Sequence, residues 1–149
     1  MGEGDAAPTP TGAMVRGVAS GRYRVALRST GLNLVDVRDV ARGHVLALER
    51  GRPGERYLLG GVDLTLAETF AAIARLAGRR APLAVLPYAA ARVLAAARLA
   101  NAQEVALARL PAWFSSAKAE RELGYRPGPV EPALARAVAE ASARRTSDG

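Results

Sequence analysis

The chain contains no cysteine and only one histidine, His44, among its 149 residues. The absence of cysteine excludes disulfides, thiolate metal ligands and thiol nucleophiles. A single histidine cannot form the histidine cluster of a typical zinc site, and a Ser-His-Asp triad would have to use His44 alone. We therefore expect no metal site and no catalytic residue in this chain.

Lysine is almost absent, because Lys118 stands beside 20 arginines. Basic residues outnumber acidic ones by 21 to 14, which gives a net charge of +7. The arginines are spread along the chain and form no block, so they indicate a solvated surface and no nucleic-acid partner.

Long hydrophobic runs are also missing. The most apolar stretch, residues 83–110, is interrupted by charged side chains such as Arg92, Arg98 and Glu104, whereas a membrane-spanning helix needs about 20 apolar residues in succession. Residues 1–10 are acidic and proline-rich and have no features of a signal peptide. We expect a cytoplasmic protein with no membrane span.

Short extended and helical patterns alternate along the sequence, which predicts an α/β fold. Strands are expected at residues 23–28, 32–35, 56–61 and 83–86. Helices are expected at residues 11–20, 37–50, 66–77, 88–103, 117–123 and 131–145. Residues 1–145 would form one unit and residues 146–149 a disordered tail.

Three of these helices have recognisable caps. Asp36 precedes the helix at 37–50, Thr65 forms a capping box with Glu68, and Ser115 or Ser116 precedes the helix at 117–123. The apolar face of the helix at 37–50 is expected to face the core and consists of Val37, Val40, Ala41, Val45 and Leu48. Asp36 and Asp39 could form an acid–base pair, but capping explains both.

Other polar and aromatic residues have a structural and a functional interpretation. His44 lies near the apolar helix face, so a packed or hydrogen-bonded histidine is favoured over a catalytic base. Trp113 and Phe114 are expected in the core, with a ligand platform as the alternative. Thr9 and Thr11 belong to a stiff Pro-Thr-Pro-Thr run, whose hydroxyls suit either a rigid turn and helix cap or ligand binding.

Four segments together resemble a known family. Residues 2–12 are similar to a GPGD-type loop, and residues 32–48 to a V-x-D-V-A-x-G-H helix start. The third segment is Arg56-Tyr-Leu-Leu-Gly-Gly61, and residues 113–127 are similar to a KA-x-x-x-LGY-x-P ending. In this order they resemble the C-terminal half of an extended short-chain dehydrogenase/reductase. The resemblance is greatest to hopanoid-associated sugar epimerases and dihydroflavonol-4-reductase-like proteins of the NAD-dependent epimerase/dehydratase family.

The resemblance implies a parent enzyme that uses NAD or NADP on a sugar or ketone. It also implies a Rossmann half with a glycine fingerprint and a catalytic Tyr-x-x-x-Lys pair, and this chain contains neither motif. We therefore expect the substrate-binding portion of such an enzyme, inactive and without cofactor by itself. Its partner would be the missing N-terminal Rossmann half. The alternative is a stand-alone, non-catalytic basic binding module derived from that portion.

The resemblance further suggests where a substrate would lie. Thr9, Thr11, Asn33 and Arg38 flank the loop and strand end that face the cleft in similar enzymes. Leu32 occupies the position at which similar nucleotide-sugar epimerases have a phosphate-binding arginine, which favours a less charged substrate. Without the other half, exposed strand edges and apolar surface are expected to cause self-association.

Overall fold

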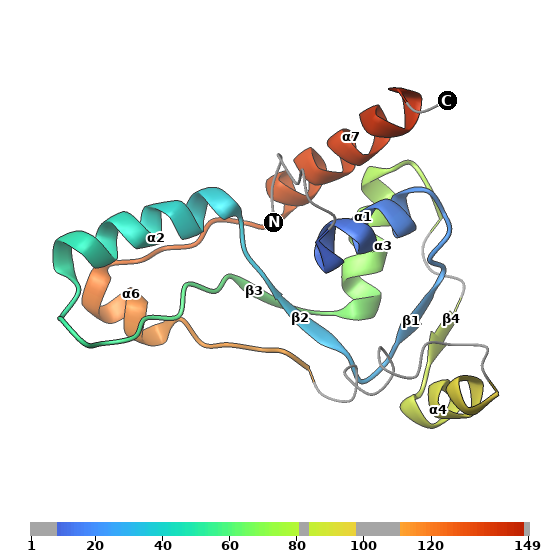
Figure 1. Ribbon diagram of the computed structural model, residues 1–149, viewed down its shortest axis with the longest axis horizontal. Coiled ribbons are helices and arrows are strands. Elements are labelled where there is room, and N and C mark those ends of the chain that lie inside the picture. Colours follow the sequence, from blue (N-terminus) through green and yellow to red (C-terminus); the bar gives the residue numbers. More distant parts are fainter. Residues whose placement is uncertain (1–8, 81–83, 98–110, 148–149) are drawn as a thin grey trace.

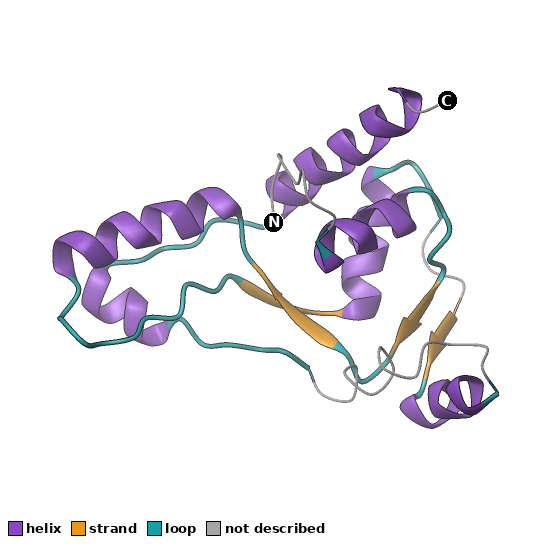
Figure 2. Ribbon diagram, viewed as in Figure 1, coloured by secondary structure: helices purple, strands orange, loops and turns teal. Residues whose placement is uncertain are grey.

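The computed structural model describes residues 9–80, 84–97 and 111–147. In chain order the elements are α1 (Pro10–Ala19), β1 (Val25–Leu27), β2 (Gly31–Leu34), α2 (Val37–Arg50), β3 (Val62–Thr65), α3 (Leu66–Leu76), β4 (Ala84–Leu86), α4 (Tyr88–Ala96), α6 (Ala117–Leu123) and α7 (Glu131–Ser147). Figure 1 shows an elongated arrangement with α2 and α6 at one end and β1, β4 and α4 at the other. The mixture of helices and short strands confirms the expected α/β class (Figure 2).

The strands form two small pairs. β1 runs parallel to β4, with Val25 opposite Ala84, and β2 runs antiparallel to β3, with Gly31 opposite Thr65. A single parallel bridge joins Leu32 to Ala112 beside the second pair. The β2–β3 pair connects the two ends of the molecule (Figure 1).

The larger core lies where α1, α3 and α7 pack together. α3 begins at a complete capping box, in which Thr65 and Glu68 each accept a hydrogen bond from the other's backbone amide. Its inner face then buries Phe70 and Ile73 against Val18 of α1 and Leu134 of α7. Capping and a spacing of three to four residues therefore fix both the start and the packed face of this helix.

A second, smaller core joins α2 to α6. Leu123 and Tyr125 are fully buried there, with Leu46 and Leu59 packed against them. Gly43 permits this contact, because a Cβ at that position would lie 2.7 Å from a methyl group of Leu59. The smaller core therefore holds the loop before β3 between the two helices.

The predicted strand at residues 56–61 is wrong, because these residues form an extended loop and the strand begins at Val62. Side chains satisfy the backbone of this loop in place of a neighbouring strand. The amide of Gly60 donates to Ser116 Oγ, and the carbonyl of Gly60 accepts from the Tyr125 hydroxyl. Within the described chain, the loop therefore lies beside polar side chains and pairs with no strand.

The prediction that the apolar face of α2 points into the core is also wrong. The residues that α2 buries are Asp39 and Gly43. Val45 is 54% exposed and Leu48 is 88% exposed, so the apolar stripe points outward. The reason is that α6 and the loop before β3 pack on a different side of α2 from the stripe.

Several predicted boundaries also shift. Thr9, two residues earlier than the expected Thr11, caps α1 by accepting a hydrogen bond from the Gly12 amide. α7 extends to Ser147 and so includes Thr146 and Ser147, which the sequence placed in a tail. The predicted helix after Pro87 is described as far as Ala96, and its expected continuation to residue 103 lies outside the described residues. No helix within the described ranges is long and apolar enough to cross a membrane.

Candidate functional site

Asn33 lies where three segments of the chain meet. Its Nδ2 donates to Asp63 Oδ1 at 2.6 Å and to the Phe114 carbonyl at 3.3 Å. Its Oδ1 accepts from the Gly61 amide at 2.8 Å. One side chain on β2 thereby links β3, the loop before it and the segment before α6. The predicted role of Asn33 in substrate binding stays a prediction beside this structural role.

Two exposed aromatic side chains adjoin Asn33. Trp113 is 50% exposed and Phe114 is 54% exposed, so the expectation that they belong to the core is wrong. Gly31 makes room for the indole, because a Cβ there would lie 2.3 Å from Trp113 Nε1. The backbone of the segment that carries these rings contacts the Asn33 amide, and exposed aromatic and polar groups are of the kinds that bind a small ligand with an apolar face and several hydroxyls.

Ser116 and Tyr125 both bind the backbone of Gly60, which precedes the Gly61 amide that Asn33 binds. The Ser116 hydroxyl accepts from Gly60, so it does not cap α6, although Ser116 is the N-cap residue. The adjacent Ser115 lies one residue before the N-cap, and its hydroxyl accepts from the Ala117 amide at 3.3 Å. Neither serine therefore makes the side-chain cap that the sequence predicted for α6. These contacts hold the loop that carries Gly60 and Gly61 against the start of α6.

The Tyr125 phenol is unsuited to proton abstraction. The hydroxyl donates to the Gly60 carbonyl at 3.0 Å, and Tyr125 is only 1% exposed. Burial, followed by the negative charge of Asp39, raises the pKa of Tyr125 above its usual value. Both effects keep the hydroxyl protonated, so its role here is structural.

Asp36 and Arg38 lie at the start of α2, a few residues after Asn33 in the sequence. Asp36 is the N-cap and accepts from the Arg38 amide at 3.0 Å. Its other carboxylate oxygen forms an ion pair with Arg136 of α7. Partial burial acts to raise the pKa of Asp36, but the Arg38 amide and the Arg136 guanidinium together lower it. Asp36 is therefore held ionised by contacts that stabilise the fold.

The four predicted substrate contacts lie on or beside three elements, and their role in binding stays a prediction. Asn33 and Arg38 belong to consecutive elements, β2 and α2. Thr9 caps α1, and Thr11 is exposed on the first turn of the same helix. α1 packs on α3 and α7. A ligand that reached all four residues would have to extend from α1 across to the start of α2.

The remaining candidates show no catalytic arrangement. His44 is exposed, and its Nδ1 lies 2.8 Å from the Val40 carbonyl oxygen, one turn earlier on the same helix. Asp39 is buried and accepts from the Gly128 amide and from Arg42. Across residues 9–80, 84–97 and 111–147, no cluster of three or more acidic or histidine side chains could hold a metal ion.

Sequence reasoning missed two features of this site. Trp113 and Phe114 are exposed because of the path of the loop that contains them. This loop has no helical or strand periodicity, so no sequence pattern predicts the exposure. The bond from Tyr125 to Gly60 spans 65 residues. The sequence contains a Gly-Gly pair and a Leu-Gly-Tyr turn, but nothing in it specifies that the tyrosine of the turn contacts the glycine pair.

Comparisons with known proteins give consistent matches. The "Putative dihydroflavonol 4-reductase" of Synechocystis sp. is 33% identical, and the match covers 93% of this chain and 44% of that protein. The solved structure of a nucleoside-diphosphate-sugar epimerase from Pseudomonas aeruginosa is 34% identical, with a TM-score of 0.78, over 97% of this chain and 45% of that one. The structure of the protein gox2253 is 37% identical, with a TM-score of 0.75, over 92% and 44% of the two chains. No protein-family model matches the chain.

More distant structures share the fold alone. The RMD protein of Pseudomonas aeruginosa, solved in complex with NADPH, is 16% identical with a TM-score of 0.67. A dTDP-glucose 4,6-dehydratase from Streptomyces venezuelae, solved with NAD bound, is 24% identical with a TM-score of 0.60.

These matches confirm the resemblance inferred from the motifs. The chain is related in sequence and fold to the NAD-dependent epimerases and reductases of the extended short-chain dehydrogenase/reductase family, and it matches their C-terminal half. It spans less than half the length of the relatives described above.

Proposed function

We propose that this chain supplies the substrate-binding side of an NAD(P)-dependent epimerase or reductase and works together with an N-terminal, nucleotide-binding half. The observation that carries the proposal is the extent of the matches. About nine-tenths or more of this chain aligns with less than half of an epimerase or reductase at 33–37% identity. The rest of such an enzyme would have to come from elsewhere in the complete protein or from a partner.

The surface of α2 supports the proposal. Val37 is 48% exposed, Val45 is 54% exposed and Leu48 is 88% exposed, and they follow one another along one side of the helix. Leu58, in the loop that was expected to be a strand, is 56% exposed. Apolar side chains gathered in this way on a helix and an unpaired segment are typical of a surface that another domain covers.

The residues around Asn33 support the substrate-binding role. Trp113 and Phe114 offer exposed rings, and Asn33 and Asp63 lie next to them with polar groups. Neither Tyr125 nor His44 is arranged to transfer a proton to a substrate. The surface can therefore bind and orient a sugar or a ketone, while the reaction itself requires groups from the other half.

Leu32 bears on the class of substrate. It lies on β2 and packs against the core of α1, α3 and α7. An arginine at the same position would offer bidentate hydrogen bonds to a diphosphate, which leucine cannot do. We therefore favour a substrate with little negative charge, such as a dihydroflavonol-like ketone or a free sugar, over a nucleotide sugar.

The cofactor would be NAD or NADP, held by the other half. The structures of related fold that contain NAD or NADPH support this assignment. In this chain the glycine run Gly51-Arg-Pro-Gly54 precedes no helix that could receive a pyrophosphate.

The first experiment is to read the coding DNA upstream of Met1 and then to co-express the encoded half with this chain. The proposal expects an in-frame glycine fingerprint and a Tyr-x-x-x-Lys pair upstream, and two halves that purify as one complex. Leu48→Glu should weaken that complex, and Val93→Glu on α4, where Val93 is 69% exposed, should not. Upstream DNA without such a half would leave a separately encoded partner as the source. Failure of this chain to form a complex with any nucleotide-binding half of this family encoded in the same genome would contradict the proposal and favour a stand-alone binding module.

A further inference from the structure

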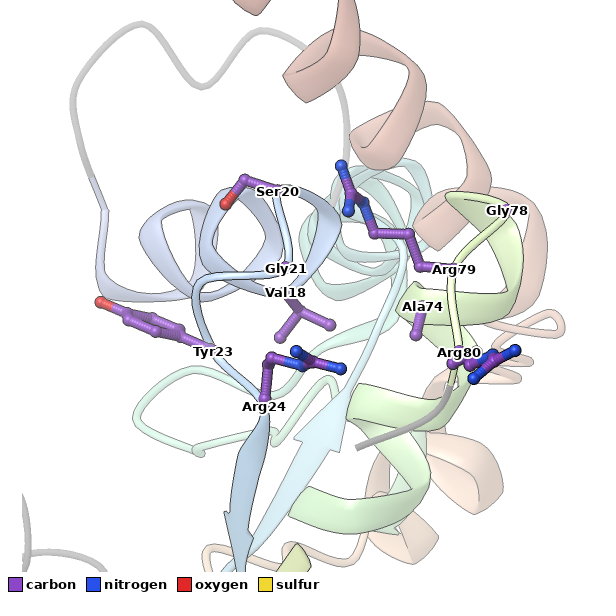
Figure 3. Close-up of a pocket in the computed structure, with 9 residues that line it drawn as sticks. All are labelled: Val18, Ser20, Gly21, Tyr23, Arg24, Ala74, Gly78, Arg79 and Arg80. Carbon is purple, nitrogen blue, oxygen red and sulfur yellow. The ribbon is translucent and has the colours of Figure 1, made fainter. Parts of the chain in front are cut away.

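A pocket lined by arginines lies away from Asn33, between the turn after α1 and the turn after α3. Its volume is about 360 Å³, which lies within the range of small-molecule sites. Arg24, Arg79 and Arg80 are among the residues that line it. Residues far apart in the sequence therefore bring arginines to one pocket, although the side chain of Arg80 points outward from it (Figure 3).

Figure 3 shows how the arginine side chains lie. Arg24 extends from the residue before β1 toward Ala74, and Arg79 extends from the turn after α3 toward Gly21. Gly21 has a φ of +80°, and a Cβ there would lie 3.1 Å from Arg79 Nη1. Because Gly21 has no side chain, the guanidinium of Arg79 can lie beside it at the edge of the pocket.

No negative charge balances these arginines within the described chain. None of the residues that line the pocket is acidic. Arg42, Arg52, Arg75 and Arg136 each form an ion pair with an aspartate or glutamate, whereas no carboxylate of the described residues pairs with Arg24, Arg79 or Arg80. Like charges held together without a partner repel one another, and an anion bound between them would offset that repulsion.

The donors in the pocket come from side chains. The amides of Gly21, Gly78 and Arg79 already donate to Val18, Arg75 and Ala74 carbonyls. Guanidinium groups donate in pairs, and their fork matches the oxygens of a phosphate group. A phosphate dianion has enough terminal oxygens to accept from two or three such forks, whereas a single carboxylate does not.

We propose that this pocket binds the phosphate group of a small phosphorylated molecule. The ligand would enter phosphate first, with Arg24 and Arg79 as its principal contacts and Arg80 at the rim. The pocket volume suits inorganic phosphate or a sugar phosphate, whereas a nucleic-acid backbone follows a longer groove. The site does not rest on the proposed epimerase or reductase function, because none of its residues belongs to the surface around Asn33.

The test is a titration of the 149-residue chain with inorganic phosphate and, separately, with a sugar phosphate and the same sugar without phosphate. Ionic strength is kept constant with chloride. Backbone amide NMR shifts of Gly21 and Gly78 report on the pocket. We expect saturable shifts with both phosphates and none with the bare sugar. An absence of saturable shifts with either phosphate would overturn the proposal, as would shifts produced by an RNA oligonucleotide alone.

Variants make the test specific. Arg79→Gln and Arg24→Gln should each weaken phosphate binding about tenfold, as expected for the loss of a charge-assisted hydrogen bond. Arg121→Gln removes the same charge from the exposed surface of α6 and should change binding less than twofold. Equal weakening by Arg79→Gln and Arg121→Gln would contradict a defined site and indicate general electrostatic attraction. The wild-type titration stays decisive if a pocket variant does not fold.

Discussion

Asp36 and Arg136 are 100 residues apart, yet their side chains form an ion pair that ties the start of α2 to α7. The pair is mostly enclosed, because the Asp36 side chain is 13% exposed and that of Arg136 is 25% exposed. It joins the end of the molecule that contains α2 and α6 to the core of α1, α3 and α7 (Figure 1). Asp36 therefore does more than cap a helix.

The two roles of Asp36 can be separated by substitution. Asp36→Asn keeps a good N-cap acceptor but loses the ion pair, and should lower the free energy of unfolding by about 2 kcal/mol. Asp36→Ala also loses the cap and should cost about 1 kcal/mol more. Urea unfolding measures both values. Glu131→Gln, in the exposed Arg75–Glu131 pair, is the control and should cost under about 0.5 kcal/mol. Equal costs for Asn and Ala would rule out the capping contribution.

Stability should fall in acid partly because of Asp36. Its contacts lower its pKa in the folded chain relative to the unfolded value of about 3.9. A lowered carboxyl pKa contributes stability above the unfolded pKa, and this contribution is lost as the pH falls through the folded pKa. Unfolding measured at neutral pH and below about pH 4 should show a smaller loss in Asp36→Asn than in the wild type. Identical losses would show that other groups account for the acid sensitivity.

Two glycine substitutions should differ in cost for a geometric reason. A Cβ at Gly61 would lie 2.2 Å from the Leu34 carbonyl oxygen, which is rigid backbone, so Gly61→Ala should cost about 2–3 kcal/mol. Gly54 has a φ of +81° and open space around it, so Gly54→Ala should cost only about 1 kcal/mol of backbone strain. Thermal unfolding of both variants checks the order. A larger loss for Gly54→Ala would contradict the close approach of Gly61 to β2.

The isolated chain should self-associate through the exposed apolar stripe of α2. The charge of +7 opposes association, and salt screens surface charges over about 8 Å at physiological ionic strength. Sedimentation velocity should therefore show larger species as salt increases. Leu48→Glu should reduce them, whereas Val93→Glu on α4 should not. A monomer at every salt concentration would contradict self-association through the apolar stripe of α2.

The sequence predicted those parts of the fold that depend on local chemistry. The start of α3 follows from Thr65 and Glu68, and the end of α6 from Gly124, whose φ of +73° requires a residue tolerant of that geometry. These signals lie within a few residues of the structure they specify. The α/β class was predictable for the same reason.

The parts that failed depend on distant partners. Residues 56–61 have the composition of a buried strand, but within the described chain Ser116, Tyr125 and Asn33 satisfy the backbone of Gly60 and Gly61. The stripe on α2 has the spacing of an inner helix face, but Val45 and Leu48 are exposed. Both predictions assumed neighbours that residues 9–80, 84–97 and 111–147 do not supply, and both errors are consistent with the proposed surface for another domain.

The arginine pocket escaped sequence reasoning for a related reason. Arg24 and Arg79 are separated by three strands and two helices in the chain, and each looks like an ordinary surface residue. Only the packing of α1 on α3 brings their turns together.

We propose that this chain provides the substrate side of an enzyme whose nucleotide site lies in another half. Binding of NADH and NADPH, followed by the fluorescence of the reduced nicotinamide, tests this claim without knowledge of the substrate. The account predicts no saturable change with the 149-residue chain alone and saturable binding once the nucleotide-binding half is present in the same complex. Saturable binding of either nucleotide by the lone chain would contradict the account.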